Sequence, residues 1–467
     1  MFIILKVVSK KGECMKLIQC AFVFVLMTGL LSPLFANGIE EQQMKLNPDD
    51  YPMGSILGDA TSGAPKLAYR GDYAIGFREI EVINPSQIDV LSSTEENLEP
   101  IYDRPITLGI WYPADVSEDT VQLCEYTDHY GRIDQGNLEP FTLMGRAVKE
   151  AEPLKSEGTF PLIVISHGYP GSLFIMSYLC ENLATKGYVV VAIAHTDSTY
   201  EDASSFSSTL INRSLDQEFT IKKMDELSKQ DGWLKGLLDA SNVGLIGYSM
   251  GAYGTVRTLG GGMNDTIANL VGHLDYILKA DPNDEGNPNI KAAVLFAPWG
   301  AAFGDLNNLG IYEMSSMLKI DTPTLWVDGT KDDIAGYEGV RGLYEASKNS
   351  DRYLLSYVNA LHNCAPDAAP ASSYTKNWDL TSRWADPTWD TRRMNNINMH
   401  FVTAFMDSYL KGDYEKMSYF DVKVENAGDG VYSVNNDGSF KSEHTYWPGF
   451  PNRSVTGVIL EHLDKEQ

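Results

Sequence analysis

A serine at position 249 lies between two glycines, in the stretch Gly247-Tyr-Ser-Met-Gly251. An apolar run, VGLIG, comes before it, and a stretch with helical spacing, GAYGTVRTL, follows it. A sharp turn from a strand into a helix would lift the serine hydroxyl clear of the backbone, and the flanking positions that crowd each other must be small. The pattern alone is common by chance, but this context raises its value. We therefore predict that Ser249 is a nucleophile.

A serine nucleophile needs a base, and His362 is the histidine best placed to supply one. It stands in the stretch NALHNC, directly after the apolar run YLLSYV. A carboxylate must then orient the imidazole, and Asp332 lies in PTLWVDGTKDD just beyond the end of a predicted strand. Asp328 is still close to that strand, and Asp333 is the nearest alternative to Asp332 as the orienting carboxylate. The order Ser249, Asp332, His362 is the order in which α/β-hydrolases carry their catalytic residues.

Two backbone N–H groups are expected to stabilise the oxyanion. Met250 follows the serine at a predicted helix N-terminus, and Tyr169 follows the strand-like run FPLIVISHG. Gly168 would let the backbone turn there. His167 stands in the same loop and is interpreted as a structural histidine rather than the base. Trp299, in FAPWG, is a candidate substrate-binding residue.

The remaining sequence predicts the scaffold that positions these residues. Short apolar runs alternate with stretches of helical spacing, which is typical of a mainly parallel sheet with helices on both faces. Trp326 falls inside one such run and is expected in the core. The residues from about 419 onward are rich in Asn, Gly and Ser, with a turn at 435–438. The predicted strands span 76–84, 106–114, 160–168, 188–197, 243–247, 292–298, 323–329 and 353–358, and the predicted helices 172–187, 215–227, 251–259 and 396–412.

The N-terminal residues and the composition indicate export. Four lysines precede the apolar run AFVFVLMTGLL, and a small-residue cleavage context ends at Ala36, which is typical of a secretory signal peptide. The apolar run is too short to span a membrane, so no stable membrane insertion is expected after cleavage. The chain carries a net charge of −26, which disfavours nucleic acid or anionic lipid as a partner. We expect a secreted or periplasmic protein.

Cysteine spacing indicates no metal site. The chain beyond the predicted signal peptide keeps Cys124, Cys180 and Cys364, and no CxxC or Cys/His cluster has the spacing of metal ligands. In an exported protein these three thiols permit at most one disulfide, and the sequence does not choose the pair. Neither a metal nor a cofactor is expected.

These motifs resemble those of the secreted bacterial α/β-hydrolases known as predicted dienelactone hydrolases, which are similar to platelet-activating-factor acetylhydrolases and to cutinase-like polyesterases. The resemblance runs from about residue 69 to 412, through GDYAIGFREIEV, PLIVISHGYPGS, GYSMGAYG, PTLWVDGTKDD and NALHNC. It implies an α/β-hydrolase fold with Ser249, Asp332 and His362 as catalytic residues, and with Tyr169 and Met250 as oxyanion donors. Dienelactone hydrolases themselves use a cysteine nucleophile, so that activity is not implied.

The sequence thus predicts an exported serine hydrolase that cleaves a small or polymeric carboxylic ester through an acyl-enzyme. An amide or other acyl hydrolase, or a catalytically silent binding module on the same fold, are the alternatives. The predicted organisation is a signal peptide over residues 1–36, a leader over 37–70, a catalytic domain over 71–418 and a small β-rich C-terminal appendage over 419–467. Three long inserts, at 198–230, 263–289 and 365–393, are candidates for a lid or rim.

Overall fold

The computed structural model describes residues 55–466, apart from residues 205, 280–285 and 302–309. The predicted signal peptide and most of the predicted leader lie outside the described residues. Across the residues that are described, no helix combines the length and apolarity needed to cross a membrane.

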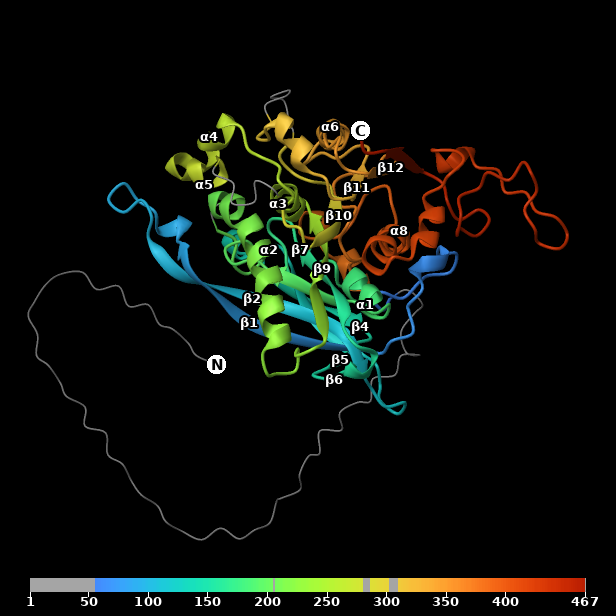
Figure 1. The fold of residues 1–467 in the computed structure, drawn as a ribbon, viewed down its shortest axis with the longest axis horizontal. Coiled ribbons are helices and arrows are strands. Elements are labelled where there is room, and N and C mark those ends of the chain that lie inside the picture. The colour runs from blue at the N-terminus through green and yellow to red at the C-terminus, as the bar shows by residue number, and fades with distance from the viewer. Residues whose placement is uncertain (1–54, 205, 280–285, 302–309, 467) are drawn as a thin grey trace, which may run out of the picture. The chain divides into compact units, whose positions relative to one another are not determined.

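A single large sheet forms the centre of the described chain (Figure 1). Its strand order is β13-β12-β11-β10-β9-β7-β8-β2-β1-β5, with β6 paired to β2. The six strands from β12 to β8 are parallel to one another, β13 is antiparallel to β12, and β2 is antiparallel to both β8 and β1, while β5 runs parallel to β1. The strands span Ile75–Ile88 (β1), Ile101–Asp115 (β2), Val148–Lys149 (β5), Glu152–Pro153 (β6), Phe160–Ser166 (β7), Val189–Ala194 (β8), Leu238–Tyr248 (β9), Ile290–Phe296 (β10), Thr324–Gly329 (β11), Arg352–Tyr357 (β12) and Val458–Leu463 (β13).

Helices cover both faces of this sheet, which is why its central strands are apolar throughout. Along β7, Ile163 and Ile165 pack into one core with α1 and α8, while Leu162 and Val164 pack into a second core with α2, α3 and α6. These helices span Ser177–Ala184 (α1), Phe206–Lys229 (α2), Met250–Thr258 (α3), Tyr337–Ala346 (α6) and Thr391–Lys411 (α8), and shorter helices span Ala268–Val271 (α4), Asp275–Lys279 (α5) and Trp378–Thr381 (α7).

The architecture confirms the predicted α/β-hydrolase fold, a mainly parallel sheet covered on both faces. Trp326 is fully buried in the core, as expected. Helix α2 is about twice as long as the predicted helix at 215–227, because the polar stretch before it is also helical. A two-stranded hairpin, Cys124–Tyr130 (β3) with Glu139–Gly145 (β4), was not predicted.

Both ends of the described chain pack against the same body. Leu57 and Ala68 are buried beside α1, where the Asn182 side chain donates to the carbonyls of Gly58 and Ala68. At the other end, β13 extends the central sheet by pairing with β12. The predicted turn at 435–438 is present, since the Gly438 N–H donates to the Asn435 carbonyl. Within the described residues Cys124, Cys180 and Cys364 are free, buried thiols.

Candidate active site

Ser249 lies at the sharp turn between β9 and α3, with a positive φ of 53°. The turn requires small neighbours. A Cβ added to Gly247 would lie 2.5 Å from the carbonyl carbon of Gly251, and one added to Gly251 would lie 2.0 Å from the carbonyl oxygen of Ser166. The two glycines therefore let the turn close on itself and let α3 approach the end of β7. The glycine–serine–glycine pattern has the steric cause that the sequence predicted.

The structure brings Ser249, His362 and Asp332 together. His362 Nε2 lies 2.9 Å from Ser249 Oγ, and His362 Nδ1 lies 2.8 Å from Asp332 Oδ2. All three side chains are less than one-tenth exposed. Burial acts to raise the pKa of Asp332, but the charge interaction and hydrogen bond with His362 outweigh burial and lower the pKa to about 2. The arrangement is a serine, a histidine and an ionised carboxylate in one chain of hydrogen bonds.

Among the three aspartates of the PTLWVDGTKDD stretch, only Asp332 bonds to His362. Its other oxygen accepts the N–H groups of Ile334 and Ala335, at 2.7 and 2.8 Å, which fixes the carboxylate. Asp328 is completely buried on β11, where burial and the nearby Asp332 carboxylate raise its pKa well above the usual range. Asp333 is exposed at the pocket edge.

The loop after β7 lies against the serine. A Cβ added to Gly168 would lie 3.2 Å from the Ser249 Cβ, so a glycine allows this approach. Tyr169 follows it and lines the pocket, and Met250 begins α3 directly after Ser249. The two residues predicted as oxyanion donors thus flank the serine from separate elements. Burial and the nearby Arg213 lower the pKa of His167 well below its usual range, so this histidine stays neutral.

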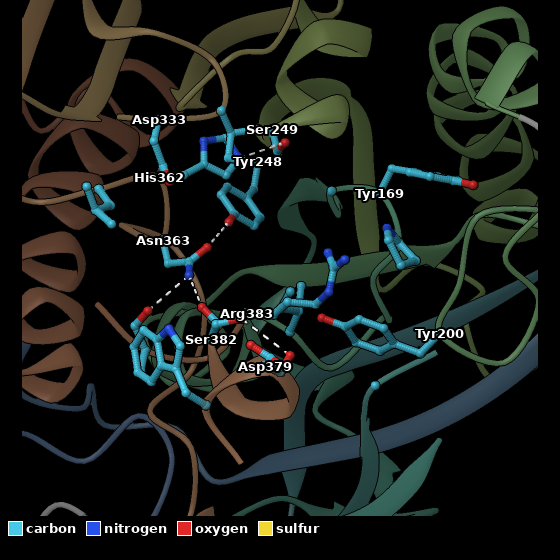
Figure 2. Close-up of a pocket in the computed structure, with 18 of the residues that line it drawn as sticks. Tyr169, Tyr200, Tyr248, Ser249, Asp333, His362, Asn363, Asp379, Ser382 and Arg383 are labelled. Carbon is cyan, nitrogen blue, oxygen red and sulfur yellow. Dashed lines mark hydrogen bonds between the residues drawn. The ribbon is translucent and has the colours of Figure 1, made fainter. Parts of the chain in front are cut away.

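A pocket with a cavity volume of about 530 Å³ opens beside Ser249 and His362 (Figure 2). Part of its lining comes from the predicted insert at 365–393, which contributes Trp378, Asp379, Ser382 and Arg383 among others. Trp299 is not among the described residues that line this pocket. It packs against Phe206 and Tyr253 instead, at ring-centroid distances of 5.0 and 6.5 Å. Its role as a substrate-binding residue stays a prediction.

Most of the side chains that line the pocket were not predicted from the sequence. Tyr248, directly before the serine, was not predicted as a site residue, yet its ring lies 5.3 Å from that of His362. Its hydroxyl donates to the side chain of Asn363, which in turn donates to the carbonyls of Ser382 and Ala385 and ties the insert to the site (Figure 2). In the sequence, the position of Asn363 directly after His362 was the one signal that it lies near the site.

The described residues hold one cluster with metal-ligand geometry, and it lies outside this pocket. Asp351 directly precedes β12, and it lies close to His462 in β13 and to Asp464 just after β13. His462 and Asp464 are exposed. The serine, histidine and aspartate site has no such group of ligands within the described residues.

Two family models match the chain. Residues 109–231 match platelet-activating factor acetylhydrolase, isoform II, and residues 214–366 match serine hydrolase (FSH1). The second match contains Ser249, Asp332 and His362.

Individual curated proteins also match part of the chain. The chain is similar to cutinase est1 of Thermobifida alba, with 27% identity over 44% of this chain and 55% of the cutinase. It is also similar to a bis(hydroxyethyl) terephthalate hydrolase of Streptomyces coelicolor, with 25% identity over 44% of this chain and 52% of that protein. The chain thus spans about half the length of the curated relatives it matches. A solved ferulic acid esterase of Streptomyces cinnamoneus aligns with a TM-score of 0.47 and 16% identity, over 75% of this chain and 94% of that one.

The family models and the relatives agree with the resemblance drawn from the motifs, and the chain is an α/β-hydrolase-fold protein similar to the cutinase-like and platelet-activating-factor acetylhydrolase-like serine esterases.

Proposed function

We propose that the protein hydrolyses carboxylic esters through an acyl-enzyme formed on Ser249. The observation that carries this proposal is the chain of hydrogen bonds from Ser249 through His362 to Asp332 at a pocket. Its relatives include proteins named as a cutinase and as a terephthalate ester hydrolase, and both names describe ester hydrolysis.

The first half of the reaction forms the acyl-enzyme. Ser249 Oγ attacks the ester carbonyl while His362 Nε2 removes its proton. Asp332 holds the other imidazole N–H and stabilises the imidazolium that results. The N–H groups of Met250 and Tyr169 donate to the oxyanion, and losing one such donor costs about 3 kcal/mol in the transition state. The tetrahedral intermediate then collapses, and His362 protonates the leaving alkoxide.

The second half releases the acid. Water attacks the acyl-enzyme, His362 removes its proton, and the carboxylic acid leaves as Ser249 recovers its hydroxyl. Every proton in both halves moves through His362. The reaction therefore needs only side chains and backbone N–H groups that lie at the site.

Export forms part of the proposal. The predicted signal peptide supports a secreted or periplasmic enzyme, and the net charge of −26 disfavours nucleic acid as a partner. The division into a leader, a catalytic domain over 71–418 and a C-terminal appendage is likewise proposed.

A fluorophosphonate probe tests the proposal, because it labels only an activated serine. We expect the purified protein to be labelled at Ser249 and the Ser249→Ala variant to remain unlabelled. Turnover is then measured on p-nitrophenyl esters and on aminoacyl anilides. Ester cleavage with little anilide cleavage supports the proposal. Preferred anilide cleavage points to an amide hydrolase, and a folded protein without labelling points to a silent binding module.

A further inference from the structure

The pocket has two chemically different sides (Figure 2). Ser249 and His362 stand on one side, and Arg383 and Tyr200 stand on the other. The cavity of about 530 Å³ is in the range of sites that enclose a small molecule. A substrate that places its ester at Ser249 therefore extends towards Arg383.

Arg383 is a half-buried cation with no bound partner in the described part of the chain. No hydrogen bond or ion pair joins its guanidinium to any described residue, although it lines the pocket. Arg132 near the same pocket differs, because two hydrogen bonds of 2.8 and 2.7 Å hold it to Asp134. A guanidinium partly removed from water gains most from a carboxylate, which it binds through two parallel hydrogen bonds.

A second unpaired donor lies beside this arginine. Tyr200 is only 1% exposed, and its hydroxyl has no hydrogen-bond partner among the described residues. Figure 2 shows the tyrosine with its hydroxyl directed towards Arg383, whose charge acts on the pKa of that hydroxyl. A buried hydroxyl without a partner is unfavourable, so the pair favours a ligand that accepts hydrogen bonds.

Two acidic side chains also line the pocket, Asp333 and Asp379. Both are exposed, and neither is paired with Arg383. Water screens exposed carboxylates more strongly than a half-buried guanidinium, so Arg383 is the less screened charge of the pocket lining. The buried Asp128, whose charge also acts on Tyr200, does not line the pocket.

We propose that Arg383 binds a carboxylate carried by the substrate itself, so that the preferred esters contain a free carboxylate at the end remote from the scissile bond. This inference rests on the proposed ester hydrolysis by Ser249. It assigns Arg383 as the residue that selects carboxylate-bearing esters over neutral ones.

The test compares esters that differ only in charge. The carboxylate stands on the acyl part in monoethyl adipate and on the alcohol part in 4-acetoxybutanoate, and each is measured against its neutral carboxamide by acid release at constant pH. We expect kcat/KM to favour the carboxylate at least about tenfold in one of the two arms, mainly through KM. Arg383→Gln should reduce that preference at least about tenfold, and Arg383→Lys should restore part of it.

Arg392→Gln is the matched control, because Arg392 is exposed on α8 and does not line the pocket. It makes the same change of charge and should leave the carboxylate preference as in the wild type. Thermal unfolding verifies that each variant is folded. The inference is overturned if the wild type shows no preference in either arm, or if Arg383→Gln and Arg392→Gln change the preference equally.

A binding measurement separates this inference from the proposed function. In the Ser249→Ala background, calorimetry compares adipate with its diamide, with and without Arg383→Gln. Adipate that binds more tightly than the diamide, and weakens about tenfold with Arg383→Gln, supports the carboxylate site even if no ester is cleaved. Equal binding of adipate and diamide refutes the site even if esters are cleaved.

Discussion

The described residues include two serine–histidine–aspartate arrays, and their local hydrogen bonds are nearly the same. In the first, His362 lies 2.9 Å from Ser249 and 2.8 Å from Asp332. In the second, His195 lies 2.8 Å from both Ser166 Oγ and Asp216 Oδ2, through the same two ring nitrogens. Interatomic distances alone would not say which array performs chemistry.

The surroundings of the two arrays differ in access and charge. Ser249 stands on a strained turn beside a pocket, whereas Ser166 ends strand β7 and is fully buried. Asp216 is bound by the Arg104 guanidinium through two hydrogen bonds of 2.9 and 3.0 Å, so its negative charge is already compensated by this arginine. We interpret the buried array as a structural one that ties β7, β8, α2 and β2 together.

The buried array also holds the loop beside Ser249. The His195 N–H donates to Nε2 of His167, and the guanidinium of Arg213 donates to the carbonyl of Gly168, at 3.1 Å in both cases. The loop proposed to carry an oxyanion donor is thus fixed by groups that take no part in the proposed reaction. Hydrogen-bonded serine, histidine and aspartate become reactive only where substrate reaches the serine and the histidine can accept its proton.

Replacing the histidine of each array in turn should give the largest difference between the arrays in activity and stability. His362→Ala should lower kcat/KM for an ester by up to about 10⁶-fold, because the base of the reaction is removed. His195→Ala should instead lower the free energy of unfolding by about 2–4 kcal/mol, since it leaves the buried Ser166 hydroxyl without its partner and takes one hydrogen bond from the buried Asp216 carboxylate. Ester kinetics and urea unfolding on both variants check this prediction. A His195→Ala protein that is stable but equally inactive would contradict our interpretation of the arrays.

Replacing the two aspartates gives the next largest difference. Asp332→Asn should lower kcat/KM by about 10⁴-fold with a smaller effect on stability, because the imidazole loses its orienting charge. Asp216→Asn should cost about 3–5 kcal/mol of unfolding free energy, because the buried Arg104 would lose the carboxylate that it binds through two hydrogen bonds. The same two measurements apply, with Asp225→Asn on the exposed face of α2 as control. Equal loss of stability in both variants would remove the distinction.

The order along the chain distinguishes the two arrays, although His195 was not considered as a candidate base from the sequence. His362 and His195 both follow buried strands and would be equal candidates by that criterion alone. Only Ser249, Asp332 and His362 occur in the order that α/β-hydrolases use, whereas Asp216 follows His195. The fold was equally predictable, since periodic apolar runs determine strands and helices locally.

The insert at 365–393 was predicted as a candidate rim and lines part of the pocket, but the individual side chains that it contributes could not be predicted. Arg383 lies in a segment without apolar periodicity, and it reaches the site through contacts made far along the chain. One such contact is the Asn363 side chain, which bonds to the carbonyl of Ser382. The hairpin of β3 and β4 was also not predicted, although its burial alternates with the period of two that is typical of a half-buried strand. Pockets depend on tertiary contacts that local patterns do not encode.

The smallest expected effect is on the pH dependence of stability, which is a further difference between the buried array and the array at the pocket. Burial and the Arg213 charge lower the pKa of His195 to about 3, although its bond to Asp216 acts in the opposite direction. The unfolded chain binds a proton at this histidine below pH about 6.5, and the folded chain does not until pH about 3. Stability should therefore fall as pH drops through that window, by at most about 1.4 kcal/mol per pH unit from this group.

His195→Gln should remove that contribution, so its unfolding free energy should depend less on pH between 6.5 and 5 than that of the wild type. Buried His400, whose pKa burial also lowers to about 3, keeps its own share of the slope in both proteins. His400→Gln is thus the matched control, with the same kind of group removed from a site remote from either array. Urea unfolding at several pH values makes the measurement. A slope that His195→Gln leaves unchanged would mean that His195 is charged in the folded protein, and the buried array would then resemble the active one more closely than its burial implies.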